Sequence, residues 1–270
     1  MKSVLRYPGS KWRIADWIIS YMPPHRSYLE PYFGSGAVFF NKPLSPIETI
    51  NDIDGDVVNL FQCIRKDSAR LAALVAATPY SRQEYNSVFE DKPSNCYEQA
   101  RRFLVRCWMA AGVRTGMKTG WRNDVQGRET AYALHNWYRL PKWIEDCAER
   151  LRQAQIECMP AIDLIKRFND SKVLIYADPP YLISTRMPKQ YRYEMTDSDH
   201  VELLKALYKH KGPVILSGYD NKLYNGYLEG WNKASISTTA ELGKKRVETL
   251  WMNFEISKQI NLFETGGIRI

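Results

Sequence analysis

Cysteine and histidine are scarce in this sequence, and neither is arranged to hold a metal ion. The five cysteines stand singly among 270 residues, at positions 63, 96, 107, 147 and 158, with no Cys-x-x-Cys pair. An odd number at such spacings argues against a disulfide framework and against a zinc site. Two of the four histidines, His200 and His210, fall within a predicted helix and are expected at the surface. We therefore expect no structural metal and a reducing cytoplasm.

The sequence also lacks a long apolar run. No segment approaches the roughly 20 apolar residues that span a bilayer. The basic start of the chain has no apolar core behind it, so we expect neither a membrane span nor a signal peptide. With 44% hydrophobic and 25% charged residues, the composition is typical of a soluble protein with one large α/β domain and a smaller insert.

Acidic residues are outnumbered, because 38 Lys and Arg residues face 30 Asp and Glu residues, a net charge of +8. Many proteins of this charge bind nothing acidic, so the location of the charge matters more. Between positions 101 and 128, Asp124 is the one acid among seven cations, and Trp108, Trp121 and several glycines are interleaved. Such a stretch is typical of a segment that lies along nucleic acid, and a solvated surface loop is the alternative.

The clearest local pattern is a buried strand that ends in an acid. Residues 173–177 are apolar or aromatic and predict a strand inside a parallel sheet. The strand stops at Asp178, because Pro179 and Pro180 cannot donate to a ladder, and Tyr181 follows. A carboxylate and a proline carbonyl can accept the protons of an exocyclic amine while a tyrosine ring stacks on the base. Asp-Pro-Pro-Tyr resembles the catalytic motif of amino-methyltransferases, which methylate adenine N6 or cytosine N4 with S-adenosylmethionine; a proline-rich loop that arose by chance is the alternative.

A turn followed by a helix is predicted near the start of the chain. Tyr-Pro-Gly-Ser-Lys occupies residues 7–11, and Ser10 is a good N-cap for a helix over residues 11–19. Free backbone N–H groups at the helix start, together with Lys11, suit a carboxylate such as the methionine end of the cofactor. A plain capped helix is the alternative.

A second glycine turn follows at Glu-Pro-Tyr-Phe-Gly-Ser-Gly, residues 30–36, between a β-prone segment and an apolar helical pattern. Its glycines let a ligand approach the backbone, and it is neither a dinucleotide fingerprint nor a P-loop. A strand then ends at Asp52, 16 residues after Gly36. This is close to the roughly 20-residue spacing at which an acid meets a ribose hydroxyl in Rossmann-like domains. Asp54 and Asp56 are interpreted as helix-start acids only.

Between residues 67 and 139 the β-rich alternation stops, and helical patterns precede a glycine-spotted loop over residues 112–127. We therefore predict a catalytic domain formed by residues 1–66 and 140–270, interrupted by an insert, residues 67–139. Later patterns predict a strand at 155–158, a helix capped by Thr196 or Asp197, a buried strand at 213–218, and two strands over 235–254 joined by a basic turn at Gly243–Arg246.

Four elements now stand in order: Tyr-Pro-Gly-Ser-Lys, Glu-Pro-Tyr-Phe-Gly-Ser-Gly, Asn-Asp-Ile-Asp and Asp-Pro-Pro-Tyr. Together they resemble the Dam-like, α-group N6-adenine DNA methyltransferases over nearly the whole chain. The resemblance extends to Ser-Gly-Tyr-Asp-Asn at 217–221 and Gly-Lys-Lys-Arg-Val-Glu at 243–248. It implies an α/β fold with a seven-stranded, Rossmann-like class I methyltransferase sheet whose last strands form a reversed hairpin. It also implies a mainly helical target-recognition insert, S-adenosylmethionine as cofactor, and methyl transfer to a flipped adenine of double-stranded DNA.

The resemblance also implies roles for individual residues. The catalytic set is Asp178, Pro179, Pro180 and Tyr181. The cofactor set is Tyr7, Lys11 near the cofactor carboxylate, Glu30, Pro31, Phe33, Gly34, Gly36, Asp52 at the ribose, Asp163 in the segment beside the cofactor's adenine, and Asp178. The expected DNA contacts are Arg114, Lys118, Trp121, Arg122, Asn123, Arg128, Arg186, Lys189, Lys244, Lys245 and Arg246.

Three rival functions use related residues. A cytosine-N4 enzyme more usually has Ser-Pro-Pro-Tyr, and a glutamine-N5 protein methyltransferase normally has Asn in place of Asp178 and lacks a basic insert. A DNA-binding protein on an inactive methyltransferase fold is opposed by the intact Asp178 and Asp52. We expect a monomer or weak dimer, with a cognate restriction endonuclease as a candidate partner. The recognition sequence is not predicted, because the base-reading residues of the insert cannot be matched one by one.

Overall fold

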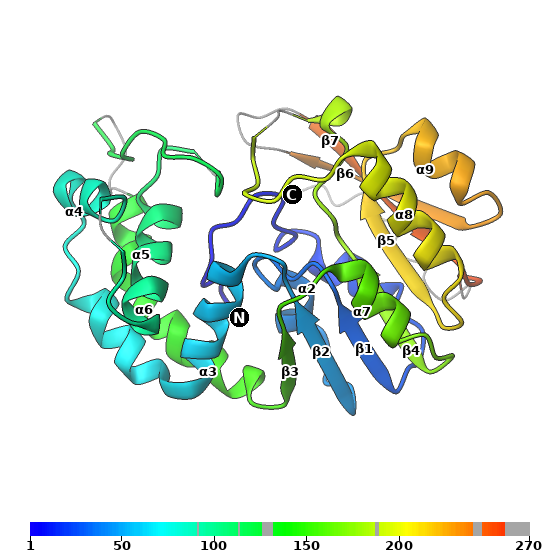
Figure 1. Ribbon diagram of the computed structural model, residues 1–270, viewed down its shortest axis with the longest axis horizontal. Helices are drawn as coiled ribbons and strands as arrows, with labels where there is room; N and C mark the ends of the chain where they lie inside the picture. Colours follow the sequence, from blue (N-terminus) through cyan, green and yellow to red (C-terminus); the bar gives the residue numbers. More distant parts are fainter. Residues whose placement is uncertain (91, 113, 126–131, 187–188, 240–244, 257–270) are drawn as a thin grey trace, which may run out of the picture.

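The computed structural model describes residues 1–90, 92–112, 114–125, 132–186, 189–239 and 245–256, and these are built around one mixed sheet (Figure 1). Within these residues the sheet has seven strands in the order β3-β2-β1-β4-β5-β7-β6. The first five are parallel, whereas β7 runs antiparallel to both β5 and β6. The predicted α/β sheet with a reversed final hairpin is confirmed. The strands are β1 Ser27–Glu30, β2 Ile47–Asn51, β3 Ala154–Glu157, β4 Val173–Ala177, β5 Val214–Gly218, β6 Asn232–Thr239 and β7 Lys245–Met252.

Helices cover both faces of the sheet, which explains why its central strands are apolar on both sides. In β4, Leu174 and Tyr176 belong to the core of one face, while Val173, Ile175 and Ala177 belong to the core of the other. This alternation is the two-residue period of a strand. The core of the first face includes residues of α1 Ala15–Ser20, α2 Ala37–Asn41, α3 Gly55–Ala76, α4 Arg82–Ser87, α5 Cys96–Trp108 and α6 Tyr132–Leu151, and the core of the second includes residues of α7 Ala161–Arg167, α8 Asp197–Tyr208 and α9 Lys222–Tyr227.

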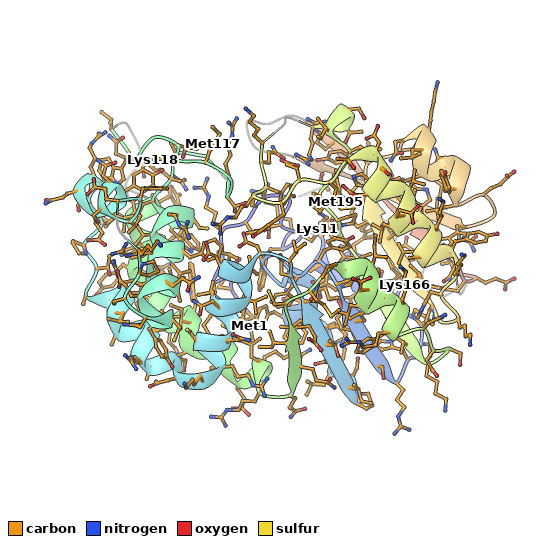
Figure 2. All side chains as sticks on the ribbon, viewed as in Figure 1. Met1, Lys11, Met117, Lys118, Lys166 and Met195 are labelled. Atoms are coloured by element: carbon orange, nitrogen blue, oxygen red, sulfur yellow. The ribbon has the colours of Figure 1, made fainter. Side chains whose placement is uncertain are left out.

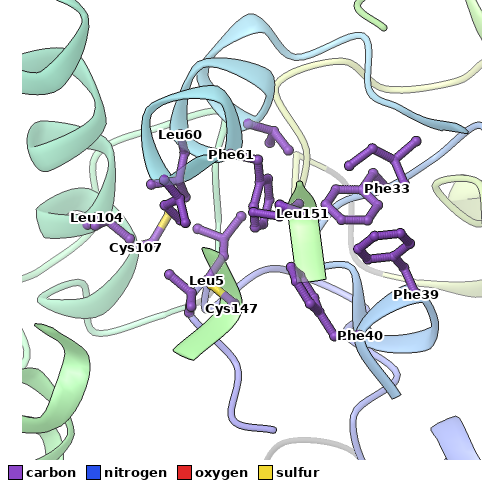
Figure 3. Close-up of a cluster of buried hydrophobic side chains, with 14 of the residues drawn as sticks. Leu5, Phe33, Phe39, Phe40, Leu60, Phe61, Leu104, Cys107, Cys147 and Leu151 are labelled. Atoms are coloured by element: carbon purple, nitrogen blue, oxygen red, sulfur yellow. The ribbon is translucent and has the colours of Figure 1, made fainter. Parts of the chain in front are cut away.

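The core of the first face continues into the helices of the predicted insert, on the left of Figure 1. One hydrophobic cluster joins Leu5, Phe33 and Phe61 to Leu104 and Cys147 (Figure 3). Its aromatic part is tight, with the ring centroids of Phe33 and Phe61 4.8 Å apart. The helical region and the sheet therefore share one packed interior.

The predicted boundaries of the insert both fall inside helices. Residue 67 is the kink of α3, where the backbone of Asp67 leaves the helical region (φ −160°, ψ 83°). Residue 139 lies within α6, which spans Tyr132–Leu151. Lys118, in the loop after α5, and Lys166, in α7, lie on opposite sides of the molecule (Figure 2). Because the two predicted boundaries lie within α3 and α6, these helices join the helical region to the sheet.

The predicted start of the first helix is wrong. Helix α1 begins at Ala15, Ile14 occupies its N-cap position, and no side chain caps it. Residues 11–14 instead form a turn in which the N–H of Ile14 donates to the carbonyl of Lys11 at 3.0 Å. The hydroxyl of Ser10 hydrogen-bonds the hydroxyl of Ser35 at 2.8 Å and is not available as a helix cap.

The predicted exposure of two histidines is also wrong. His200 is buried in α8, where its Nδ1 lies 2.9 Å from the hydroxyl of Tyr224. His210 is buried just beyond α8, with Nε2 3.0 Å from the carbonyl oxygen of Val173. Both rings pack against neighbouring elements, which a helical pattern alone does not reveal. The predicted cap of α8 is confirmed, because Thr196 forms a capping box with Asp199.

No helix in the described part of the chain is long and apolar enough to cross a membrane. Among the same residues, no group of three or more His, Cys, Asp or Glu side chains is placed to hold a metal ion.

Gly36 sits in the left-handed region (φ 65°) at the start of α2, and a Cβ there would overlap the rings of Phe33 and Phe40. We expect Gly36→Ala to lower the free energy of unfolding by at least about 1–2 kcal/mol from the backbone alone, with a further loss from displaced rings. Urea denaturation measures this change. The matched control is Gly226→Ala in α9, where a Cβ has open space and alanine should be neutral or stabilising by up to about 1 kcal/mol. Equal stability of the two variants would contradict the expectation.

Candidate active site

A cavity of about 300 Å³ opens at the carboxyl ends of β1, β2 and β4. In an open α/β sheet this edge, where the strand order reverses, is the usual ligand site. Lys11 and Met195, both in its wall, lie near the middle of the molecule (Figure 2). Of the predicted catalytic and cofactor residues, those that line it are Tyr7, Lys11, Glu30, Pro31, Phe33, Gly34, Asp52, Asp178 and Pro180.

Four predicted residues lie outside that wall within the described chain: Gly36, Asp163, Pro179 and Tyr181. Asp163 is exposed in the first turn of α7, and the residues just before it, 160–162, line the cavity in its place. The helical turn rotates the acid outward, which the sequence pattern did not reveal.

The glycine turn after β1 is locked to the acid after β2. The N–H of Gly34 donates to Oδ2 of Asp52 at 2.8 Å, and the N–H of Asp54 donates to Oδ1 at 2.9 Å. Gly34 has a positive φ of 49°, and a Cβ there would lie 3.0 Å from the ring of Tyr7. Burial raises the pKa of Asp52 to about 6, against the lowering effect of these hydrogen bonds.

Lys11 and Asp178 form the central ion pair of the site. Nζ of Lys11 lies 2.9 Å from Oδ2 of Asp178 and donates to the carbonyl of Gly9 at 2.7 Å. Burial raises the pKa of Asp178 to about 6, and the ammonium of Lys11 opposes that shift. Burial lowers the pKa of Lys11, but Asp178 and Glu248 outweigh it and hold that pKa above its usual value.

Tyr181 is buried behind this ion pair and is 8% exposed. Nζ of Lys11 lies 4.8 Å from its ring centroid, and the edge of Tyr219 packs on it with centroids 4.7 Å apart. Its hydroxyl donates to the carboxylate of Glu248, which also accepts from Ser217 at 2.7 Å. Neither Ser217 nor Glu248 was predicted as a site residue, although Ser217 belongs to the motif at 217–221 and Glu248 to the motif at 243–248.

Glu30 is a second buried acid in the cavity wall. The hydroxyl of Tyr28 donates to its Oε2 at 2.6 Å. Burial raises the pKa of Glu30 to about 8, although the bond from Tyr28 lowers it, so this carboxyl is mostly protonated at neutral pH.

The loop after Tyr181 forms the outer wall of the cavity, and Arg186 holds it in place. Nε of Arg186 donates to the carbonyl of Tyr181 at 2.6 Å, and its guanidinium pairs with Glu194. Arg186 was predicted to contact DNA, but this side chain is buried in the loop. Tyr191, which sequence analysis missed as a cavity residue, lies over Gly9 and has its ring centroid 6.0 Å from that of Tyr7.

The loop after Tyr181 is also bonded to the basic loop after α5. The N–H of Thr115 donates to the carbonyl of Gln190 at 3.0 Å, and the N–H of Arg192 donates to Oγ1 of Thr115 at 3.1 Å. The guanidinium of Arg192 reaches Asp56 at 2.9 Å, and Arg106 of α5 reaches the same carboxylate at 2.6 Å. Asp56 is therefore more than a helix-start acid.

Asp54 keeps the predicted position at the start of α3, where its side chain accepts from the N–H of Asp56 at 3.0 Å. Burial raises the pKa of Asp54 above its usual value. It also lines the cavity beside Asp52, a position that the helix-start interpretation did not include.

The predicted DNA contacts differ in their exposure. Lys118, Asn123 and Lys189 are exposed. Trp121 is partly buried between the ring of Tyr80 and the guanidinium of Arg82, which lies 5.0 Å from the Trp121 ring. Arg114 and Arg122 are partly buried. Arg246 lies in β7 rather than in a turn, and its guanidinium lies over the ring of Tyr219. Arg128, Lys244 and the Lys245 side chain lie outside the described atoms.

Comparison with known proteins identifies relatives. Residues 7–242 match the family model described as D12 class N6 adenine-specific DNA methyltransferase. The chain is 25% identical to the DNA adenine methylases of Salmonella typhi and Escherichia coli K12 over 235 residues, 82% of this chain and 82% of each relative. It is 24% identical over 270 residues to the Type II methyltransferase M.MjaIII of Methanocaldococcus jannaschii, covering 84% of this chain and 89% of that one.

The raised pKa of Glu30 has a testable effect on stability. The Glu30 carboxyl loses its proton near pH 4.5 in the unfolded chain but only near pH 8 in the folded protein. Between these two values the folded protein binds the extra proton, so the free energy of unfolding falls as pH rises. Above about pH 8 the effect of this carboxyl is constant. Glu30→Gln cannot titrate. We therefore expect its melting temperature, relative to the natural protein, to rise from about pH 5 to about pH 8 and then level off.

The control for Glu30→Gln is Glu145→Gln, which removes an exposed carboxyl from α6 and should give a difference that is flat with pH. A flat difference for Glu30→Gln as well would show that Glu30 is ionised in the folded protein.

Proposed function

Because this chain belongs to the D12 class N6 adenine-specific DNA methyltransferases, we propose that its cavity holds S-adenosylmethionine beside Asp178 and that Asp178 and Pro179 bind the amine of a flipped adenine. The protein is an adenine DNA methyltransferase that uses S-adenosylmethionine. The observation that carries the proposal is the shared cavity, whose wall includes both Asp178 at the end of β4 and the Gly34 turn after β1.

The residues in the wall fit the proposed cofactor. A volume of about 300 Å³ suits a small-molecule site. The carboxylate of Asp52 accepts backbone N–H groups, including those of Gly34 and Asp54, and keeps capacity to accept a ribose hydroxyl. Ile53, which is 47% exposed, and the segment 160–162 supply a partly apolar wall for the adenine. Aromatic rings and acids around the remaining space suit a cationic sulfonium.

Lys11 is assigned a second task beside the predicted contact with the cofactor carboxylate. Its ammonium has three donors, and two of them reach Gly9 and Asp178. The third can bind a carboxylate of the cofactor, while the pair with Asp178 keeps that side chain ionised near neutral pH.

Asp178 and Pro179 then activate a weak nucleophile. The lone pair of the adenine amine is shared with the ring, and two acceptors at its N–H groups draw the nitrogen toward a tetrahedral shape. When bound, S-adenosylmethionine supplies a methyl group on a positively charged sulfur. Asp178, with a pKa of about 6, is mainly a carboxylate at neutral pH and can take the proton that the methylated nitrogen releases.

Stacking of the base on Tyr181 requires a local rearrangement. One face of the ring is covered by the ammonium of Lys11, and the ring makes a T-shaped contact with that of Tyr219. A base that stacks on the face covered by Lys11 must displace the ammonium. Extrusion of the base costs a few kcal/mol in any case, and stacking would offset part of that cost.

We assign double-stranded DNA to the side of the molecule that carries the loop after α5. Lys118, Asn123 and Lys189 are exposed there and can reach phosphates or base edges. The bonds between Thr115 and the loop after Tyr181 support this placement, because they join the proposed target-recognition insert, residues 67–139, to the cavity wall. A monomer or weak dimer, a cognate restriction endonuclease and a cytoplasmic location stay predictions from the sequence.

Asp178→Ala should retain binding of S-adenosylmethionine and lose methyl transfer to unmethylated DNA by about 10²- to 10⁴-fold. Labelled methyl transfer followed by nucleoside analysis measures the rate and identifies N6-methyladenine. In the natural protein, the turnover number should fall as pH drops below about 6, because Asp178 must be a carboxylate to accept the amine.

The matched control for Asp178→Ala is Asp163→Asn, which alters an exposed acid of α7 outside the cavity wall and should leave turnover and cofactor affinity unchanged. Near-normal turnover of Asp178→Ala would overturn the proposed mechanism, and weakened cofactor binding by Asp163→Asn would restore the role predicted for Asp163.

Lys118→Ala should weaken DNA binding and reduce the slope of log affinity against log salt concentration by about 1, because one phosphate contact is lost. Lys166→Ala removes an exposed cation from the opposite side of the molecule and should leave both quantities unchanged (Figure 2). Fluorescence anisotropy over a salt series measures them. Equal effects of the two substitutions would place the DNA elsewhere.

A further inference from the structure

Glu248 is a buried carboxylate that the proposed mechanism does not use. It lies on β7, where it pairs in register with Ile236 of β6, and it is 5% exposed. A charge in such a place is costly unless it is paired and hydrogen-bonded. The contacts of its carboxylate therefore identify the groups that stabilise the buried charge.

The partners of Glu248 belong to the catalytic edge of the sheet. Its carboxylate accepts from the hydroxyl of Tyr181 in the catalytic motif and from Oγ of Ser217 at the end of β5. Nζ of Lys11 lies 3.9 Å away, so the ammonium stands between Glu248 and Asp178. The reversed strand thus delivers a second carboxylate to the ion pair of the active site.

We propose that Glu248 is a positioning residue for methyl transfer, which anchors Tyr181 and holds Lys11 when Asp178 receives the substrate amine. This inference rests on the proposed function of Asp178. It gives the reversed hairpin a part in the reaction besides closing the sheet.

Three geometric facts support the proposed role. Lys11 now occupies Oδ2 of Asp178, so an amine that binds this carboxylate competes with the ammonium for acceptor capacity. A carboxylate 3.9 Å from Nζ offers the ammonium a second counter-charge, so that it need not leave the site. The same carboxylate fixes the hydroxyl end of Tyr181, whose ring lies beneath Lys11. Loss of such support can misplace reacting groups enough to cost about 100-fold in rate.

The charge on Glu248 also acts on Asp178. The two carboxylates flank one ammonium, and the charge on Glu248 is among the causes that raise the pKa of Asp178, after burial. Removal of that charge must therefore shift the ionisation of Asp178 toward lower pH. Among the described residues, the titratable and charged groups around Glu248 include Lys11, Tyr176, Asp178, Tyr181, Tyr219 and Arg246, which lies over the Tyr219 ring.

The test compares Glu248→Gln with Glu248→Asp in the full-length protein. Glu248→Gln keeps the length of the side chain and an acceptor but loses the charge. We expect its turnover number to fall about 10- to 100-fold, with KM for S-adenosylmethionine within about threefold, because Glu248 is outside the cavity wall. The acid limb of its pH–turnover profile should move to lower pH. Glu248→Asp keeps the charge but shortens the reach, so its turnover should also fall while the acid limb stays in place.

The link through Tyr181 is tested with Tyr181→Phe, which removes the hydroxyl that Glu248 binds. If Glu248 acts partly through that hydroxyl, the effects of Tyr181→Phe and Glu248→Gln on turnover should be less than multiplicative in the double variant. Strictly multiplicative effects would remove Tyr181 from the inference. Glu229→Gln, which alters an exposed carboxyl before β6, is the matched control and should match the natural protein.

The outcomes separate this inference from the proposed function. Natural turnover and an unmoved acid limb in Glu248→Gln, with Asp178→Ala inactive, would refute the role of Glu248 alone. An active Asp178→Ala would refute the proposed function itself. A Glu248→Gln variant with lowered melting temperature but normal kinetics would show a structural role only. If Glu248→Gln does not fold, Glu248→Asp decides the question, because natural turnover in that variant also contradicts the inference.

Discussion

Lys11 and Asp178 are far apart in the sequence, and their ion pair forms part of the cavity wall. Around it the fold buries more carboxylate charge than a single ammonium can neutralise, since Asp52 and Asp178, whose pKa values burial raises only to about 6, are both mainly ionised at neutral pH. Buried like charges that lack counter-charges destabilise their ionised forms. The site therefore favours a cationic ligand, and the sulfonium of the cofactor meets that need. Binding to the folded form alone would also stabilise the protein.

Patterns that depend on a few consecutive residues were predictable from the sequence. The strand before Asp178 was recognisable because an apolar run meets two prolines, and the Gly34 turn because the chain passes from strand to helix. Side-chain pairings that depend on how the chain folds back on itself were not predictable. Arg186 has the charge of a DNA contact, but Glu194 and the carbonyl of Tyr181 claim it. Likewise, Ser10 has the chemistry of a helix cap, but Ser35 binds its hydroxyl.

The same distinction applies to the insert. A change in hydrophobic period marks residue 67, but the helix itself only kinks there and continues to Ala76. The two helices that contain the predicted boundaries, α3 and α6, both contribute to the core of the first sheet face. A rigid junction of this kind holds the loop after α5 at a defined distance from the cavity, which a flexible linker between separate domains would not do. The rigidity of the junction is evident only from the structure, in which α3 packs against α5 and α6.

The position of β7 determines when the active site can form during synthesis of the chain. This strand is the last of the sheet in sequence but lies between β5 and β6, and it carries Glu248 to Lys11, close to the other end of the chain. A nascent chain that has left the ribosome only as far as β6 contains Lys11, Asp52 and Asp178, yet its sheet is incomplete and its catalytic edge lacks one carboxylate. The active site can therefore be completed only after β7 has been translated and has paired with β5 and β6.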